Sequence, residues 1–154
     1  LPVNETVGGD TAFIIPNTDT TLTIPSTSER VITVGAYDSV NISTVGFSGR
    51  GYTRATEYIK PDLVAPGVNI LTTTVGGSII SFTGTSAAAP FVAGSVALLM
   101  EWGIVDRNDI FLYGERLKAF LCTGAIRDNS REYPNREWGY GRLCLKNTLD
   151  LLKK

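Results

Sequence analysis

The longest apolar run in the chain, residues 87–102, places the tightest limit on the fold. It is rich in Ala, Val, Leu and Met and has no polar face. A helix with this pattern is stable only when its whole surface is covered, so the run predicts a helix buried all round in the middle of a larger α/β domain. Pro90, Gly94 and Ser95 interrupt the run, which falls short of a transmembrane span.

Short apolar segments before this helix predict strands. Residues 31–36 form a β-branched run that ends in glycine and alanine, the pattern of a parallel strand buried on both faces. Residues 63–65 lie between two prolines and predict a second strand, and residues 68–71 and 78–82 predict two more around a Gly-Gly pair. Residues 12–15 and 22–24 predict edge strands.

Two further helices are expected towards the C-terminus. Leu117, Phe120 and Leu121 fall on one face of a helix over residues 115–122, which Gly124 ends. Residues 145–152 place three leucines on one helical face, and the Trp-Gly-Tyr-Gly sequence at 138–141 predicts a turn that leads into a short strand. A chain of 154 residues with these elements predicts one compact α/β domain.

Charge and cysteine content argue against several kinds of binding. The formal net charge is −1 and there is no basic patch, which argues against nucleic-acid binding. Cys122 and Cys144 are too few for a four-ligand zinc site, and Asp106, Asp109 and Asp128 lack the close spacing of a calcium site. We therefore expect no metal and no cofactor. The cysteines could form one disulfide, but a chain of this length favours two small apolar side chains.

The chain contains no histidine. Histidine is the commonest general base and the side chain that titrates near neutral pH without special burial. No catalytic dyad or triad that uses histidine can therefore be complete within these 154 residues.

Ser86 is the strongest candidate for a chemically active residue. The predicted strand at 78–82 leads through small residues to Ser86, which stands at or next to the N-terminus of the long apolar helix. Free N–H groups and the positive end of the helix dipole can stabilise an oxyanion at this place. Position alone favours another role, because serine at a helix start is more often an N-cap than a nucleophile.

Several motifs in register resemble one protease family. Residues 84–94, Gly-Thr-Ser-Ala-Ala-Ala-Pro-Phe-Val-Ala-Gly, resemble the nucleophile signature of the subtilisin-like serine proteases, the subtilases of peptidase family S8. Residues 31–36 with 47–49, residues 60–67 and residues 138–141 resemble further motifs of the family, in its order and at about its spacing. The resemblance covers roughly residues 25–152, and residues 47–52, 102–105 and 133–135 look most like the clostridial branch that includes the Csp germination proteases.

The resemblance implies a role for three residues. Ser86 would be the nucleophile that forms an acyl-enzyme, and its backbone N–H would be half of the oxyanion hole. The Thr85 hydroxyl would support that hole, and Pro25 would stand near the wall of the specificity pocket. The implied fold is the C-terminal part of a three-layer subtilisin-like domain, with a parallel sheet and a central helix that starts at the nucleophile. Residues 25–154 would form this part and residues 1–24 the end of an upstream insert.

The family's chain order of Asp, His and then Ser accounts for the missing histidine. The resemblance implies that the catalytic Asp and His and the oxyanion Asn come from an upstream part of the same protein, which is the expected partner beside a polypeptide substrate. Exported or spore-associated proteins are typical of the family. No lysine is expected to replace the histidine, because all five lie in polar sequence contexts: Lys60, Lys118, Lys146, Lys153 and Lys154.

Two other functions remain open. The chain could belong to a non-catalytic pseudoprotease or binding scaffold with the same fold, or Ser86 could cap a core helix in an unrelated α/β domain. If the chain is part of a protease, we expect the 154 residues alone to have no protease activity. We also expect them to expose apolar strand edges and faces and to self-associate.

Overall fold

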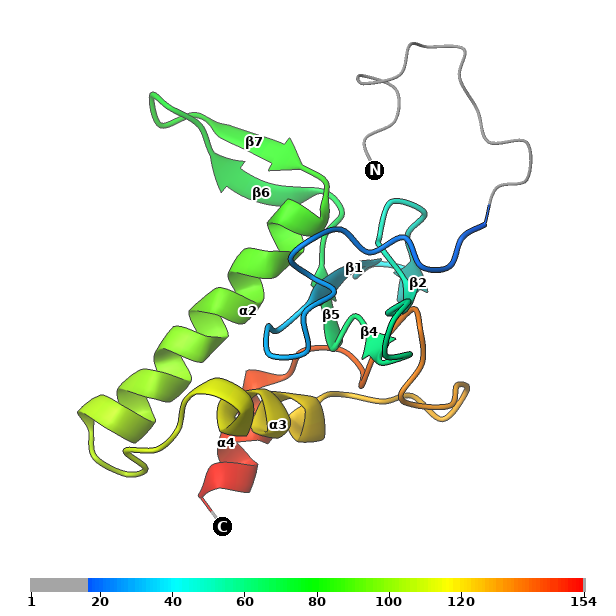
Figure 1. Ribbon diagram of the computed structural model, residues 1–154. Helices are drawn as coiled ribbons and strands as arrows, with labels where there is room; N and C mark the ends of the chain where they lie inside the picture. Colours follow the sequence, from blue (N-terminus) through cyan, green and yellow to red (C-terminus); the bar gives the residue numbers. More distant parts are fainter. Residues whose placement is uncertain (1–16, 154) are drawn as a thin grey trace.

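A computed structural model describes residues 17–153, so the predicted strand at 12–15 and most of the proposed insert end lie outside the described residues. The elements follow one another from a strand-rich half to a helical half (Figure 1). They are β1 Val34–Asp38, β2 Ser43–Thr44, β3 Gly51–Tyr52, β4 Ile59–Lys60, β5 Leu63–Pro66, β6 Ile70–Thr73, β7 Ile79–Phe82, α2 Thr85–Met100, the π-helical η1 Glu101–Val105, α3 Gly114–Gly124 and α4 Leu145–Leu152.

A parallel pair of strands forms the floor of the fold. β1 and β5 run parallel with Val34 opposite Leu63 and Ala36 opposite Ala65, which confirms the predicted parallel strands. β2 pairs antiparallel with β1, but only with Tyr37 and Asp38, the last two residues of β1. On the other side of β5, the Val64 N–H donates to the Gly141 carbonyl over 3.0 Å. The expected short strand after the Trp-Gly-Tyr-Gly turn is reduced to an isolated bridge between Arg142 and Val64 of β5.

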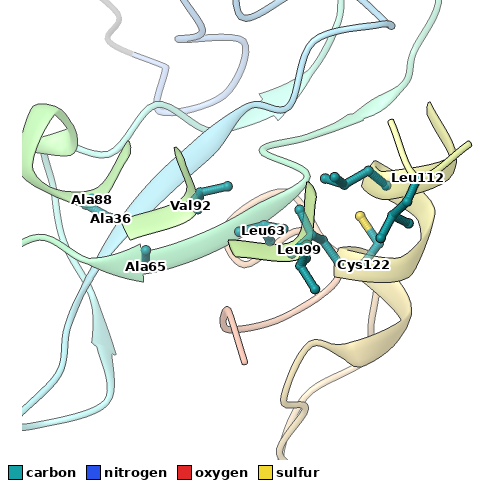
Figure 2. Close-up of a cluster of buried hydrophobic side chains, with 10 residues drawn as sticks. Ala36, Leu63, Ala65, Ala88, Val92, Leu99, Leu112 and Cys122 are labelled. Atoms are coloured by element: carbon teal, nitrogen blue, oxygen red, sulfur yellow. The ribbon is translucent and has the colours of Figure 1, made fainter. Parts of the chain in front are cut away.

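The long apolar helix α2 packs on this pair (Figure 1). Ala88, Val92 and Leu99 face the floor residues Ala36, Leu63 and Ala65, and Leu112 and Cys122 close the far end of the cluster (Figure 2). Small alanines meet where α2 crosses the strands, which lets the helix lie close to the sheet.

The sequence predicts that α2 is buried all round within a larger domain. Within residues 17–153, only one face of α2 is buried. Phe91 and Leu98 on its other face are 43% and 53% exposed. The physical reason is that residues 17–153 supply a packing layer for one face of the helix only. An apolar pattern on every side calls for two layers.

With η1, the helix is longer than the sequence predicted. Residues 85–105 form a continuous helical segment of 21 residues with a mean hydropathy of 1.6. By length and composition alone this segment could cross a membrane, whereas the shorter run predicted from the sequence could not. This is weak evidence for a span, because the core helix of a globular domain passes the same test. The packing of Ala88, Val92 and Leu99 on β1 and β5 places one face of the helix in the protein core.

The two shorter helices that the sequence predicts are present, and they pack against each other beyond the sheet. α3 buries Leu117 and Leu121, and α4 lies across its end. The contact needs Gly124, because a Cβ there would lie 2.5 Å from Thr148 Oγ1 and 2.8 Å from the Thr148 nitrogen.

β6 and β7 form an antiparallel hairpin that projects beyond the N-terminal end of α2 (Figure 1). Both strands were predicted, and both are exposed for most of their length, including Leu71 at 74% and Ile79 at 70%. The strand expected at 22–24 is wrong: residues 24–27 form a turn.

Candidate active site

Ser86 is the second residue of α2, and its side chain is exposed. Gly84 is the N-cap residue, and no side chain caps the helix. The interpretation of Ser86 as an N-cap is therefore wrong. The strand β7, the turn at Thr83 and Gly84 and the helix follow one another as predicted, so the hydroxyl stands at the positive end of a 16-residue helix.

Main-chain hydrogen bonds fix the turn before Ser86 to the parallel strands. The Gly84 N–H donates to the Gly67 carbonyl over 2.9 Å, and the Gly67 N–H donates to the Tyr37 carbonyl at the end of β1 over 3.0 Å. A Cβ at Gly67 would lie 2.6 Å from Ala36 Cβ and 3.0 Å from the Gly84 oxygen. Only glycine lets the three segments approach so closely.

A second contact ties the hairpin to the same turn. The Asn69 N–H donates to Thr83 Oγ1 over 2.9 Å, and Asn69 has a φ of 53°, in the left-handed region that asparagine tolerates better than most residues. Gly67 and Asn69 therefore hold the turn before Ser86 through two hydrogen bonds, one with Gly84 and one with Thr83. The sequence motif at 60–67 pointed to this segment, but nothing in it indicated the contact with Gly84.

Ser86 stands between two hollows. The first has a volume of about 630 Å³ and is mostly apolar. It lies between the hairpin and the helix start, with lining residues Ile70, Leu71, Thr72, Phe82, Ala87, Pro90 and Phe91.

The second hollow has a volume of about 1070 Å³ and lies on the other side of Ser86. Its walls come from the start of β1, the loop at 46–50, the segment 17–26 and the first turn of α2. Pro25, Thr85 and Ser86 all line it. The structure thus brings together the three residues that the sequence singled out, from segments 60 residues apart.

Two of the five lysines pair with the buried carboxylate of Asp62. Lys60 is 2% exposed and its Nζ lies 2.7 Å from Asp62 Oδ2, while Lys118 Nζ lies 2.9 Å from Asp62 Oδ1. The surroundings of Lys60 are polar, as predicted, but its side chain is buried, and the ion pair with Asp62 compensates this burial. The spacing of Lys60 and Asp62, just before the buried strand β5, is the sequence signal that could have indicated this ion pair.

The two cysteines are unpaired, in agreement with the favoured interpretation. Cys122 is buried in α3, and burial, reinforced by the charge of Asp62, raises the pKa of its thiol to about 11. Cys144 is half-buried. Within residues 17–153, no group of three or more Cys, Asp or Glu side chains is placed to hold a metal ion.

Comparison with solved structures relates this architecture to known proteases. The CspB protease of Clostridium perfringens superposes with a TM-score of 0.90 at 50% sequence identity, over 94% of this chain and 31% of that chain. The self-cleaved protease domain of PatA superposes with a TM-score of 0.65 at 29% identity, over 84% of this chain and 44% of that chain.

Sequence relatives give the same picture. A protein of Aquifex aeolicus without an assigned function is 34% identical in an alignment of 137 positions that covers 75% of this chain and 59% of that protein. The serine protease AprX of Bacillus subtilis is 37% identical in an alignment of 101 positions that covers 53% of this chain and 23% of that protein. The chain thus spans from about a quarter to three fifths of these relatives. The subtilase family model matches residues 4–141, and the chain belongs to the subtilase family.

Proposed function

We propose that Ser86 is the nucleophile of a subtilisin-like serine endopeptidase, formed when this chain is joined to the rest of a subtilase domain. The observation that carries the proposal is the place of Ser86: exposed, in the first turn of α2, between two hollows. A peptide that runs from one hollow to the other passes over the hydroxyl.

The reaction has two halves. Ser86 Oγ attacks the carbonyl carbon of the peptide bond, its proton passes to a general base, and the carbonyl oxygen becomes an oxyanion. The Ser86 N–H and the dipole of α2 stabilise this charge, with support from the Thr85 hydroxyl. The C–N bond then breaks as the base returns the proton to the leaving amine, and water releases the acyl group from Ser86 by the same steps.

The general base has to come from outside these 154 residues, which hold no histidine. A serine hydroxyl is a weak nucleophile without one, and in subtilisin itself removal of the base costs roughly a factor of 10⁶ in turnover. The chain alone is therefore inactive in this proposal. The Asp, the His and the oxyanion Asn belong to the upstream part of the same protein, as the partial coverage of the relatives allows.

The described residues offer that upstream part a place to pack. β2 pairs only with Tyr37 and Asp38, so among residues 17–153 the start of β1 has a strand neighbour on the β5 side alone. The second hollow runs along this open edge, past residues 31–34, and ends at Ser86. An added strand here would extend the sheet and deliver its end to the nucleophile.

A chimera tests the proposal. This chain replaces the matched third of the Clostridium perfringens CspB protease, and a fluorophosphonate probe reports whether Ser86 is activated. We expect the chimera to be labelled and the 154-residue chain to stay unlabelled. Ser86→Ala in the chimera should abolish labelling, and Ser78→Ala, an exposed serine in the hairpin turn, should leave it unchanged.

Two results would contradict the proposal. Labelling that survives Ser86→Ala would assign the activity to another serine. A folded chimera without labelling would favour the alternative, a non-catalytic scaffold of the same fold.

A further inference from the structure

Three charged side chains meet below the start of β1, apart from the proposed chemistry at Ser86. Lys60 ends β4, Asp62 precedes β5 and Lys118 comes from α3. Asp62 is 3% exposed. Burying three charges is costly unless each is paired and hydrogen-bonded, so their contacts decide what the cluster does.

The Lys118 ammonium lies among three oxygens. Its Nζ donates to the Glu29 carbonyl over 2.7 Å, to Asp62 Oδ1 over 2.9 Å and to the Val31 carbonyl over 3.2 Å. The three acceptors come from two segments about 30 residues apart. The ammonium is therefore the common centre that joins them.

Lys60 and a backbone amide complete the cluster. Lys60 Nζ donates to Asp62 Oδ2 over 2.7 Å and to the Val31 carbonyl over 3.0 Å. The Thr33 N–H donates to Asp62 Oδ2 over 2.7 Å. The cluster thus holds the main chain from Glu29 to Thr33, and Val31 and Thr33 line the second hollow beside Ser86.

The ligand set around Lys118 is the kind that binds hard cations. One carboxylate oxygen and two main-chain carbonyls are the oxygen donors that such ions prefer. Burial works against the charge on Lys118, but the hydrogen bond and the charge of Asp62 outweigh it and raise the pKa of Lys118. Burial lowers the pKa of Lys60 despite the same carboxylate.

We infer that the Lys118 ammonium is a built-in cation, which fills an oxygen site formed by Glu29, Val31 and Asp62 and so fixes the main chain that leads into β1. When the ammonium is removed, this site takes a monovalent cation of ammonium size, such as potassium. A monovalent ion fits because it restores the single positive charge that the ammonium supplied opposite Asp62 Oδ1. The inference does not depend on the protease activity of Ser86.

The test is Lys118→Met, which keeps an unbranched side chain and removes the charge. The thermal unfolding midpoint of the 154-residue chain is measured in potassium chloride and in choline chloride at equal ionic strength, because choline is too large for the site. We expect the unsubstituted chain to have the same midpoint in both salts. Lys118→Met should have a lower midpoint in choline and recover at least half of the loss in potassium.

Two further variants locate the effect. Lys146→Met removes an exposed lysine that pairs with Asp150 one turn away on α4, and it should show no preference between the salts. Adding Asp62→Asn to Lys118→Met should abolish the recovery, because the carboxylate oxygen that faces the ion is lost.

Every other pattern overturns the inference. An unchanged midpoint for Lys118→Met would show that the ammonium does not stabilise the main chain at Glu29 and Val31. An equal loss in both salts would show that no cation replaces the ammonium. If Lys118→Met is unfolded in choline, circular dichroism should show folding as potassium chloride rises. A variant that stays unfolded in both salts contradicts the inference as well.

Discussion

At the scale of single residues, the candidate site depends on positions that carry no reactive group. Ser86 is placed by the turn at Gly84, which in turn is held by the carbonyl of Gly67. Gly67 touches Ala36 on the parallel floor, so a change of one methyl group there is felt at the nucleophile.

We expect Gly67→Ala to destabilise the chain by roughly 1–3 kcal/mol, because its Cβ would overlap Ala36 Cβ and crowd the Gly84 oxygen. Urea unfolding measures the loss. Gly46→Ala is the matched control, since a Cβ there has no atom within 4 Å, and it should stay within about 0.5 kcal/mol. Equal effects of the two substitutions would show that the close approach at Gly67 is not needed.

Cys122 predicts a loss of stability at alkaline pH. Its pKa rises from 9.0 to about 11 on folding, so between these values the folded state holds a proton that the unfolded state has lost. Stability should therefore fall as pH rises from 9 towards 11, by an amount on the order of 2–3 kcal/mol. Chemical unfolding across this range should show a shallower decline for Cys122→Ala than for the unsubstituted chain. Cys144→Ser should keep the original decline; if it does not, the effect belongs elsewhere.

At the scale of elements, the sequence predicted those with a clear apolar period. The parallel strands, the hairpin strands and the helices α2, α3 and α4 are confirmed, because each has a run of apolar or β-branched residues long enough to detect. β2, β3 and β4 were not predicted, because two-residue strands have no period to detect. The place of Ser86 followed from a strand, a small-residue turn and a helix. The contact between Gly84 and Gly67 spans 17 positions and that between Lys118 and Glu29 spans 89, which no local pattern reveals. Lys60 and Asp62 of the same cluster are two positions apart, so their pair is visible in the sequence.

Alanine substitutions at Gly124, between α3 and α4, and at Gly94, in α2, should change the free energy of unfolding in opposite directions. Gly124→Ala should destabilise the chain by roughly 1–3 kcal/mol, because its Cβ would meet backbone as well as the Thr148 side chain. Gly94→Ala lies mid-helix in α2 with open space around it, and it should stabilise the chain by about 0.4–1 kcal/mol. Urea unfolding of both variants should give opposite signs. The same sign for both would mean that the two helices do not meet through Gly124.

At the scale of the whole molecule, apolar side chains remain on the outside of α2 and on both strands of the hairpin. Phe91, Leu98, Leu71 and Ile79 are each more than two fifths exposed, as expected for a chain that covers only part of its relatives. Surfaces of this kind mark protein contacts.

We predict that the 154-residue chain self-associates through these faces. Sedimentation velocity should show a weight-average mass that rises with concentration. Leu98→Lys with Ile79→Lys should reduce the association, because a charge on each face opposes burial. Lys substitutions at Thr73 and Ser78, which are exposed and polar, serve as controls and should leave it unchanged. A monomer at all concentrations would contradict the prediction.

Because the space around Gly94 is open, the effect of Gly94→Ala on stability depends on whether another part of the protein covers this face of α2. Glycine costs roughly 1 kcal/mol more than alanine inside a helix, and none of the residues from 17 to 153 requires it at this position. If another layer comes to lie on this face of α2, the same methyl has to fit against it. Gly94→Ala should then change from stabilising in the 154-residue chain to destabilising in the CspB chimera. The sign of that change in the free energy of unfolding would report whether the outer face of the helix is free or covered.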